Sequence, residues 1–211
     1  MFTGIIATVG QIHRITPLAV EAPYAGVRLS IHAPTLGLED VQIGDSIAIN
    51  GACMTVVAKT TEHFEVDVSH ESLSKTVGLS THGPVNLEKA LRLQDRIGGH
   101  LTTGHIDSIG TVVKLEPLGE SWQLVVQISK SLARYCAVKG SITINGVSLT
   151  VNTVSDHAQG CDIRINLIPH TWQFTTMNLL KIGSRVNVEI DLIARYMQRM
   201  LSTAQGYSQS L

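Results

Sequence analysis

The stretch SIAINGACMTV (residues 46–56) is repeated later in the chain as SITINGVSLTV (residues 141–151). The two segments share Asn-Gly and Thr at matching places, while Cys53 in the first stands where the second has Ser148. Asn-Gly accepts positive φ at both central positions of a tight turn, so each segment is typical of a β-hairpin. Because polar residues are retained along with apolar ones, the repeat predicts two related small-molecule pockets with different roles.

Three further pairs of segments recur in the same order. They are TGIIATVG (3–10) with TGHIDSIG (103–110), FEVDVSHESL (64–73) with IRINLIPHTW (163–172), and VNLEKAL (85–91) with VNVEIDL (186–192). The offsets of 100, 99 and 101 residues drift slightly, which indicates a duplicated domain with small insertions. We therefore expect one domain over residues 1–95 and a second over residues 96–191.

Within each copy the apolar residues alternate with polar ones. Phe64, Val66 and Val68, for example, alternate with Glu65 and Asp67. A period of two, interrupted by Gly-containing turns, predicts short antiparallel strands. Helical patterns between them are too few for parallel βαβ units, so a small closed barrel without exposed sheet edges is expected in each copy. The predicted fold class is all-β.

The C-terminal segment has a different pattern. Its apolar residues follow the spacing of one helical face: Leu192, Ile193, Tyr196, Met197, Met200 and Leu201. We expect an amphipathic helix over residues 192–204 and a frayed tail over residues 205–211. Such a stripe must be covered by its own chain or by the same helix of other subunits, and we favour an oligomerisation helix.

Composition limits the possible partners. The chain has 211 residues, 44% of them hydrophobic, and only 6 prolines, which indicates an ordered globular protein. Sixteen basic and 17 acidic residues give a net charge of −1, so we expect no nucleic-acid partner. No apolar stretch has membrane-spanning length and no signal-peptide pattern is present, so we expect a cytoplasmic protein with no membrane partner. Three cysteines without CxxC spacing are expected to be free thiols.

Polar residues that follow the two Asn-Gly turns are the first candidates for chemistry. Strand alternation places Cys53 and Thr55 on one face in the first copy, and Ser148 and Thr150 on one face in the second. A thiol and hydroxyls of this kind could hold a neutral polar ligand. Tight turns without any binding role remain the alternative interpretation of both segments.

His105 is a second candidate, because the first copy has Ile5 at the matching position. A structural and a proton-transferring role are both open for it. His100, His105 and Asp107 form a conceivable metal set, but strand alternation places His100 on the opposite face, so we predict no metal site. The sequence also lacks GxGxxG, GxxxxGK[ST] and GxSxG motifs, which argues against dinucleotide-dependent, phosphoryl-transfer and hydrolase chemistry.

Taken together, the segments MFTGI, NGACMTV, NGVSLTV, GGHLTTGHID, IPHT and VNVEID resemble the riboflavin synthase family over essentially the whole chain. The resemblance implies two six-stranded antiparallel Greek-key barrels and a C-terminal helix around which homotrimers assemble. It implies an enzyme that converts two molecules of 6,7-dimethyl-8-ribityllumazine into riboflavin and 5-amino-6-(D-ribitylamino)uracil by transfer of a four-carbon unit, without metal or cofactor. Each active site would lie between the N-terminal barrel of one subunit and the C-terminal barrel of a neighbour.

The resemblance also carries over site positions. Expected substrate contacts in the first barrel's pocket are Gly4, Ile5, Ile6, Cys53, Met54, Thr55, Asp67, Val68, Ser69, His70, Glu71, Ser72, Gly104, His105 and Ile106. Those in the second barrel's pocket are Lys139, Ser148, Leu149, Thr150, Ile168, Pro169, His170, Thr171, Trp172 and Gln173. Positions expected to support catalysis are Phe2, Ser46, Cys53, His105, Thr150 and Asp191. His105, helped by Thr150, would relay a proton, while Trp172 would either stack on a ligand ring or pack in the fold.

Two rival function classes share parts of this pattern. Non-catalytic lumazine- or flavin-binding accessory proteins of bioluminescent bacteria resemble the family but tend to lose one pocket's contacts. Here Gly104-His105, Ser148–Thr150 and the IPHT segment are all present. A flavin-binding barrel of a reductase would need an attached nucleotide-binding domain, for which the residues after 192 leave no room. We therefore expect a synthase and keep the accessory protein as the alternative.

Overall fold

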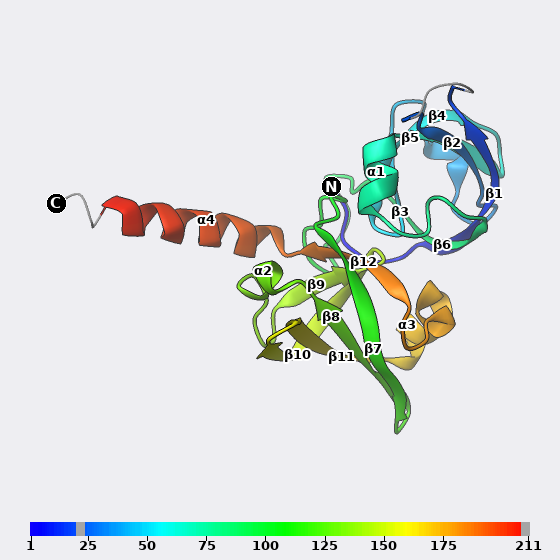
Figure 1. Cartoon of the computed structure of the whole chain (residues 1–211). Helices are drawn as coiled ribbons and strands as arrows, with labels where there is room; N and C mark the ends of the chain where they lie inside the picture. Colours follow the sequence, from blue (N-terminus) through cyan, green and yellow to red (C-terminus); the bar gives the residue numbers. More distant parts are fainter. Residues whose placement is uncertain (20–23, 208–211) are drawn as a thin grey trace.

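The computed structural model describes residues 1–19 and 24–207. Over these residues the chain forms two closed six-stranded antiparallel barrels and a long C-terminal helix (Figure 1). The predicted all-β class and the internal duplication are both confirmed. No helix in this part of the chain has the length and apolar character needed to cross a bilayer.

The two barrels have the same strand order. The first contains β1 (Thr8–Pro17), β2 (Val27–His32), η1 (Leu38–Asp40), β3 (Ser46–Ile49), β4 (Ala52–Lys59), β5 (His63–Val68), α1 (His70–Lys75) and β6 (Gly83–Lys89). The second contains β7 (Ser108–Leu118), β8 (Ser121–Ile128), α2 (Lys130–Ala133), β9 (Ser141–Ile144), β10 (Val147–His157), β11 (Gly160–Leu167), α3 (Pro169–Phe174), η2 (Thr176–Leu179) and β12 (Arg185–Ile190). Around the first barrel the order is β1-β2-β5-β4-β3-β6, and the second repeats it as β7-β8-β11-β10-β9-β12.

The repeated Asn-Gly segments form the β3–β4 and β9–β10 hairpins. Asn50 and Asn145 both have φ of 46°, and the glycines that follow them have φ of 84° and 82°. Positive φ at both central residues matches the twist of the flanking strands. The prediction of two tight hairpin turns is therefore confirmed.

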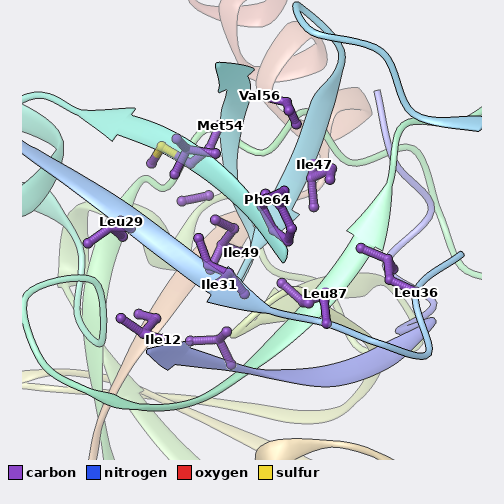
Figure 2. Packing of buried hydrophobic residues seen from close by; sticks show 14 of the residues in the cluster. Ile12, Leu29, Ile31, Leu36, Ile47, Ile49, Met54, Val56, Phe64 and Leu87 are labelled. Atoms are coloured by element: carbon purple, nitrogen blue, oxygen red, sulfur yellow. The ribbon is translucent and has the colours of Figure 1, made fainter. Parts of the chain in front are cut away.

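Each barrel has its own hydrophobic core, as the period of two predicts. In β5, Phe64, Val66 and Val68 are fully buried, whereas Asp67 between the latter two is exposed. Figure 2 shows Phe64 inside the first barrel among side chains that include Ile31 and Leu87. Burial of a side chain of this size contributes about 1.5–3 kcal/mol, so the barrels are the rigid frame on which the surrounding loops and short helices are held.

The C-terminal helix α4 spans Leu192–Tyr207 and extends away from both barrels (Figure 1). It begins where expected and continues past residue 204; residues 208–211, the rest of the expected tail, lie outside the described part. Ser202 and Thr203 donate their hydroxyls back to the carbonyl oxygen of Arg199, which keeps these polar groups satisfied within the helix. The apolar face is exposed at Ile193, Tyr196, Met197, Met200 and Leu201.

The two Asn-Gly hairpins meet each other where the barrels join. A Cβ atom on either Gly51 or Gly146 would lie 2.7 Å from the backbone nitrogen of the other. The side-chain amide of Asn86 donates to the carbonyl oxygen of Asn145 at 2.9 Å, and that of Asn187 donates to the carbonyl oxygen of Asn50 at 3.0 Å. The turns therefore build the contact between the repeats.

Candidate functional site

A cavity of about 230 Å³ opens beside β4 and α1 of the first barrel. We call it the first pocket, and its lining consists of Ala52, Cys53, Met54, Glu71, Ser72, Lys75, Thr76, Gly104, His105 and Ile106. Cys53, Met54, Glu71 and Ser72 come from the first repeat, whereas the last three lining residues come from the second. The structure thus brings these expected site residues together, and their contact with a ligand stays a prediction.

The short helix α1 supplies one wall of the first pocket. Ser69 caps it by accepting a hydrogen bond from the Ser72 backbone N–H at 3.1 Å. Glu71 and Lys75 lie four residues apart on this helix, as do Ser72 and Thr76, so both pairs share one face. Lys75 and Thr76 were not among the expected contacts, although this helical spacing would have indicated them.

The opposite wall is the segment around Gly104. The carbonyl oxygen of Gly104 accepts a hydrogen bond from the Cys53 backbone N–H at 2.8 Å. Gly104 has φ of 80°, and a Cβ atom at this position would lie 2.5 Å from the Cβ of Cys53. Only glycine allows the two backbones to approach this closely. The contact places the exposed side chain of His105 in the lining beside Cys53.

A second cavity of about 360 Å³ lies against α3 of the second barrel. This second pocket is lined by Ile6, Ala7, Thr8, Val9, His170, Gln173 and Phe174. The Ser148 backbone N–H donates to the carbonyl oxygen of Gly4 at 2.7 Å, which repeats the Cys53–Gly104 contact with the repeats exchanged.

The expectation that Gly4, Ile5 and Ile6 belong to the first pocket is therefore wrong. Gly4 lies on Ser148, and Ile6 packs against the core of the second barrel. Ile5 is half exposed and lines a neighbouring hollow that includes Arg96 of the linker. The physical reason is that each Thr-Gly segment crosses to the barrel of the other repeat, an arrangement that strand periodicity within one copy does not reveal.

The polar group beside Ser148 is His100, which the sequence interpretation set aside. Its Nδ1 lies 2.7 Å from Ser148 Oγ and its Nε2 lies 3.2 Å from Thr143 Oγ1. Burial lowers the pKa of His100, and the charge of Asp191 only partly opposes this, so the neutral imidazole is favoured. The sequence interpretation weighed His100 only as a member of a metal set and assigned it no other role, and residues 96–101, which contain it, form no regular strand.

Among the described residues of the first barrel, no imidazole is hydrogen-bonded to Cys53 as His100 is to Ser148. Cys53 pairs with Ala48 across the β3–β4 hairpin, where Ser148 pairs with Thr143 across the β9–β10 hairpin. The first pocket therefore combines a thiol with an exposed imidazole, whereas the second barrel holds its serine hydroxyl on a buried imidazole. The expectation of two related small-molecule pockets with different roles stays a prediction.

Several expected contacts of the first barrel lie outside the pocket lining. The guanidinium of Arg28 donates to both carboxylate oxygens of Asp67, at 2.7 and 2.8 Å, and this pairing lowers the pKa of Asp67. Val68 is fully buried in the core. The exposed His70 makes an edge contact with Tyr24, and Thr55 is exposed on β4.

Expected contacts of the second barrel are also dispersed. Leu149 is in the core, Thr150 is exposed on β10, and Lys139 occupies a left-handed turn with φ of 68°. Trp172 stacks on Trp122, with ring centroids 4.3 Å apart and planes 6° apart. Of the two roles open for Trp172, this geometry supports packing.

The start of α3 contains the remaining expected contacts. Ile168 is the N-cap residue and Pro169 occupies the first turn, where a missing N–H costs nothing. The carbonyl oxygen of Thr171 accepts a hydrogen bond from Thr175 Oγ1 at 2.7 Å. Only His170 and Gln173 of this group line the second pocket.

The positions expected to support catalysis have three different environments. Phe2 is 1% exposed and pairs through its backbone with Thr102 between the repeats. Ser46 begins β3 and is half-buried, away from the first-pocket lining. Asp191 Oδ1 accepts a hydrogen bond from the Ile193 backbone N–H at 2.9 Å, so this carboxylate caps the start of α4.

The three thiols also differ in environment. Burial raises the pKa of Cys136 to about 12 and that of Cys161 to about 11, so both remain protonated at neutral pH. Cys53 alone of the three lines one of the two pockets. Among the described residues, no group of three or more His, Cys, Asp or Glu side chains is arranged to hold a metal ion.

Comparison with known proteins gives a family. The model of the lumazine binding domain matches residues 3–90 and again residues 103–191. Riboflavin synthases from Photobacterium phosphoreum and Actinobacillus pleuropneumoniae are 40% and 41% identical to this chain, over 95% of it and 89% and 90% of their own lengths. That from Bacillus subtilis is 38% identical over 97% of this chain and 91% of its own. The chain belongs to the riboflavin synthase family.

Solved structures show a similar fold. LumP complexed with riboflavin matches with a TM-score of 0.77 and 28% identity, and LumP complexed with 6,7-dimethyl-8-(1'-D-ribityl) lumazine matches with a TM-score of 0.75 and 28% identity. Each match covers 90% of this chain and 99% of the LumP chain. The family resemblance stated from sequence segments is confirmed.

Proposed function

We propose that this member of the riboflavin synthase family catalyses the dismutation of two 6,7-dimethyl-8-ribityllumazine molecules. The products are riboflavin and 5-amino-6-(D-ribitylamino)uracil, and a four-carbon unit passes from one lumazine to the other. The observation that carries the proposal is that the repeat-related residues Cys53 and Ser148 have different polar neighbours, His105 in the lining of the first pocket and His100 within the second barrel. One substrate molecule must donate and an identical one must accept, so two similar but unequal sites fit the reaction.

The proposed chemistry begins with the acidic C7 methyl group of one lumazine, whose anion is delocalised over the heterocycle. His105 is placed to take and return this proton because its side chain is exposed in the first pocket. Proton relay of this kind typically contributes about 10² to 10⁴-fold in rate. Holding two flat molecules in register contributes about 7–11 kcal/mol, and we assign that role to the pocket linings. No cofactor has a part in this scheme.

A complete active site would require two subunits. Thr150, the proposed helper of His105, is exposed on β10 of the second barrel, and no hydrogen bond between the two is found in the described residues. We propose that His105 of one subunit and Thr150 of a neighbour meet in a homotrimer. The exposed apolar face of α4 supports this assembly, because an unpaired face of this size on a soluble enzyme is normally buried against another copy.

The accessory-protein alternative predicts binding without turnover. The LumP structures show that the fold can hold the same ligands. The higher identity to synthases, 38–41%, favours catalysis. The cytoplasmic location expected from the sequence stays a prediction.

The deciding experiment mixes purified protein with 6,7-dimethyl-8-ribityllumazine in buffer that contains EDTA and no magnesium. Riboflavin and the uracil product are then quantified by chromatography. Equal amounts of both products support the dismutation. Tight binding of lumazine that stays unchanged would overturn it and support a carrier. Formation of product only after a metal is restored would overturn the cofactor-free scheme.

A further inference from the structure

The buried glutamates on the last strands of the two barrels have mirrored environments. Glu189 on β12 accepts hydrogen bonds from the Thr103 backbone N–H at 2.6 Å, the Thr103 hydroxyl at 2.7 Å and the Gly104 N–H at 3.0 Å. Glu88 on β6 accepts the same three bonds from Thr3 and Gly4, at 2.7, 2.7 and 2.9 Å. Glu189 is 2% exposed and Glu88 is 7% exposed. Each buried glutamate therefore holds one Thr-Gly segment in place.

Each of these glutamates holds a segment that reaches the barrel of the other repeat. The segment held by Glu189 lies against Cys53 through the carbonyl of Gly104 and carries His105 into the first pocket. The segment held by Glu88 lies against Ser148 through the carbonyl of Gly4. The glutamate that holds each segment therefore belongs to one barrel, whereas the segment contacts the other barrel.

The same two strands also hold the helical wall of the opposite pocket. Asn187, two residues before Glu189, accepts from the Val77 N–H at 2.7 Å and donates to the Val77 carbonyl at 3.1 Å. Val77 directly follows Thr76 at the end of α1, in the first barrel. Asn86, two residues before Glu88, accepts from the Thr176 N–H at 2.8 Å, which follows α3 in the second barrel.

We infer that the last strand of each barrel builds the pocket of the other barrel, with Glu189 and Asn187 as positioning residues for the first pocket and Glu88 and Asn86 for the second. Glu189 acts through Gly104 to set the location of His105 and touches no reacting atom. This inference rests on the proposed function only where it concerns substrate. The geometric part, in which residues of one barrel hold the walls of the other barrel's pocket, rests only on hydrogen bonds within this chain.

A carboxylate is required because three donors converge on two oxygens. A glutamine at either position would present one carbonyl oxygen and one N–H group, so one of the three donors would face another donor. A buried donor left without a partner is costly, and a hydrogen bond to a charged acceptor is among the stronger ones. Glu189→Gln and Glu88→Gln therefore form a matched pair that loosens one crossing segment each.

The test is hydrogen exchange by mass spectrometry on the full-length protein and both variants, with and without riboflavin as the probe. Without ligand, Glu189→Gln should raise the exchange rate of the amides at 103–106 by roughly tenfold or more, the effect of losing one such hydrogen bond. Residues 3–6 should stay unchanged. Glu88→Gln should give the reverse. With riboflavin, Glu189→Gln should lose protection at 52–55 and 71–76 while residues 169–174 keep it.

Thr103→Val and Thr3→Val provide a second matched pair if the glutamine variants fail to fold. Each removes the hydroxyl that donates to the glutamate and accepts from the backbone N–H two residues later, that of His105 at 3.3 Å or Ile5 at 3.2 Å. Thr103→Ser should restore both the protection of residues 103–106 and turnover. A merely structural defect would not be confined to one segment.

Three outcomes would overturn the inference: both glutamine variants loosening the same segment, each loosening its own barrel's pocket, or neither changing exchange at all. Absence of riboflavin protection in the parent protein would instead count against the proposed function. In that case the ligand-free comparison would still show whether each glutamate holds its own Thr-Gly segment.

Discussion

The Cys53 backbone N–H donates to the carbonyl oxygen of Gly104 at 2.8 Å, although these two residues belong to different repeats. This bond joins β4 of the first barrel to the segment that carries His105. The first pocket is therefore a property of the duplicated chain. A single repeat would contain Cys53 without His105, or His105 without Cys53.

Gly104→Ala should disrupt this contact. The alanine Cβ would lie 2.5 Å from the Cys53 Cβ, so the segment must move out of the first pocket. Strain at positive φ costs about 1–2 kcal/mol, and overpacking adds about 1–3 kcal/mol. Urea unfolding and riboflavin formation check the change. Gly44→Ala is the control, because Gly44 has φ of 97° but nothing within 4 Å of a Cβ atom, and it should show the strain without the loss of turnover. Equal effects of the two variants would contradict the role of the contact.

His105→Ala should lower turnover by about 10² to 10⁴-fold and leave riboflavin binding largely intact, because the imidazole moves a proton and the pocket walls hold the ligand. Steady-state riboflavin formation and a fluorescence titration measure the two effects. His82→Ala, at an exposed histidine of the first barrel, is the control. Unchanged turnover in His105→Ala would remove this residue from the mechanism.

His100 should make the fold sensitive to acid. Burial lowers the pKa of His100 below its ordinary value of 6.5, so the unfolded chain takes up a proton at a higher pH than the native one does. The stabilisation is present above pH about 6.5 and is lost as pH falls through the window down to the folded pKa. Urea unfolding between about pH 7.5 and 5.5 should show a smaller loss of stability in His100→Gln than in the parent. An identical loss in both would show that His100 does not contribute.

Met197→Asp should dissociate the proposed trimer, because it places a charge on the exposed apolar face of α4. Turnover should fall with the assembly, since each active site is proposed to need two subunits. Light scattering and riboflavin formation measure both properties. Gln198→Asp adds the same charge on the opposite face and should leave both unchanged. A dissociated but fully active Met197→Asp protein would place the whole active site within one subunit.

The barrels, the hairpins and α4 could be predicted because their signals are local. Alternation places Phe64 inside and Asp67 outside from the sequence alone, and Asn-Gly specifies its turn without reference to the rest of the chain. The last helical residue of α4, Tyr207, lies three residues beyond the expected residue 204. Helix boundaries are the least reliable part of a prediction from one sequence.

The site was harder to predict because it depends on how the two copies face each other. Gly4 was assigned to the wrong barrel since nothing within one repeat shows that its segment crosses over. The contact of His100 with Ser148 could not be predicted, because His100 lies in a segment without regular secondary structure. The retained Asn and Glu of VNLEK and VNVEI were available as a signal, since polar residues kept in both copies of a buried strand need a reason.

The opposed turns at Gly51 and Gly146 also bear on how a duplicated gene can diverge. A side chain gained by either glycine would strike the backbone of the other copy, so at this point neither repeat can change alone. Two residues after each of these glycines, Cys53 and Ser148 also meet the other repeat, but through their backbone N–H groups. The halves of this protein remain alike where an added side chain would strike the other copy, and their side chains can differ where only the backbone makes the contact.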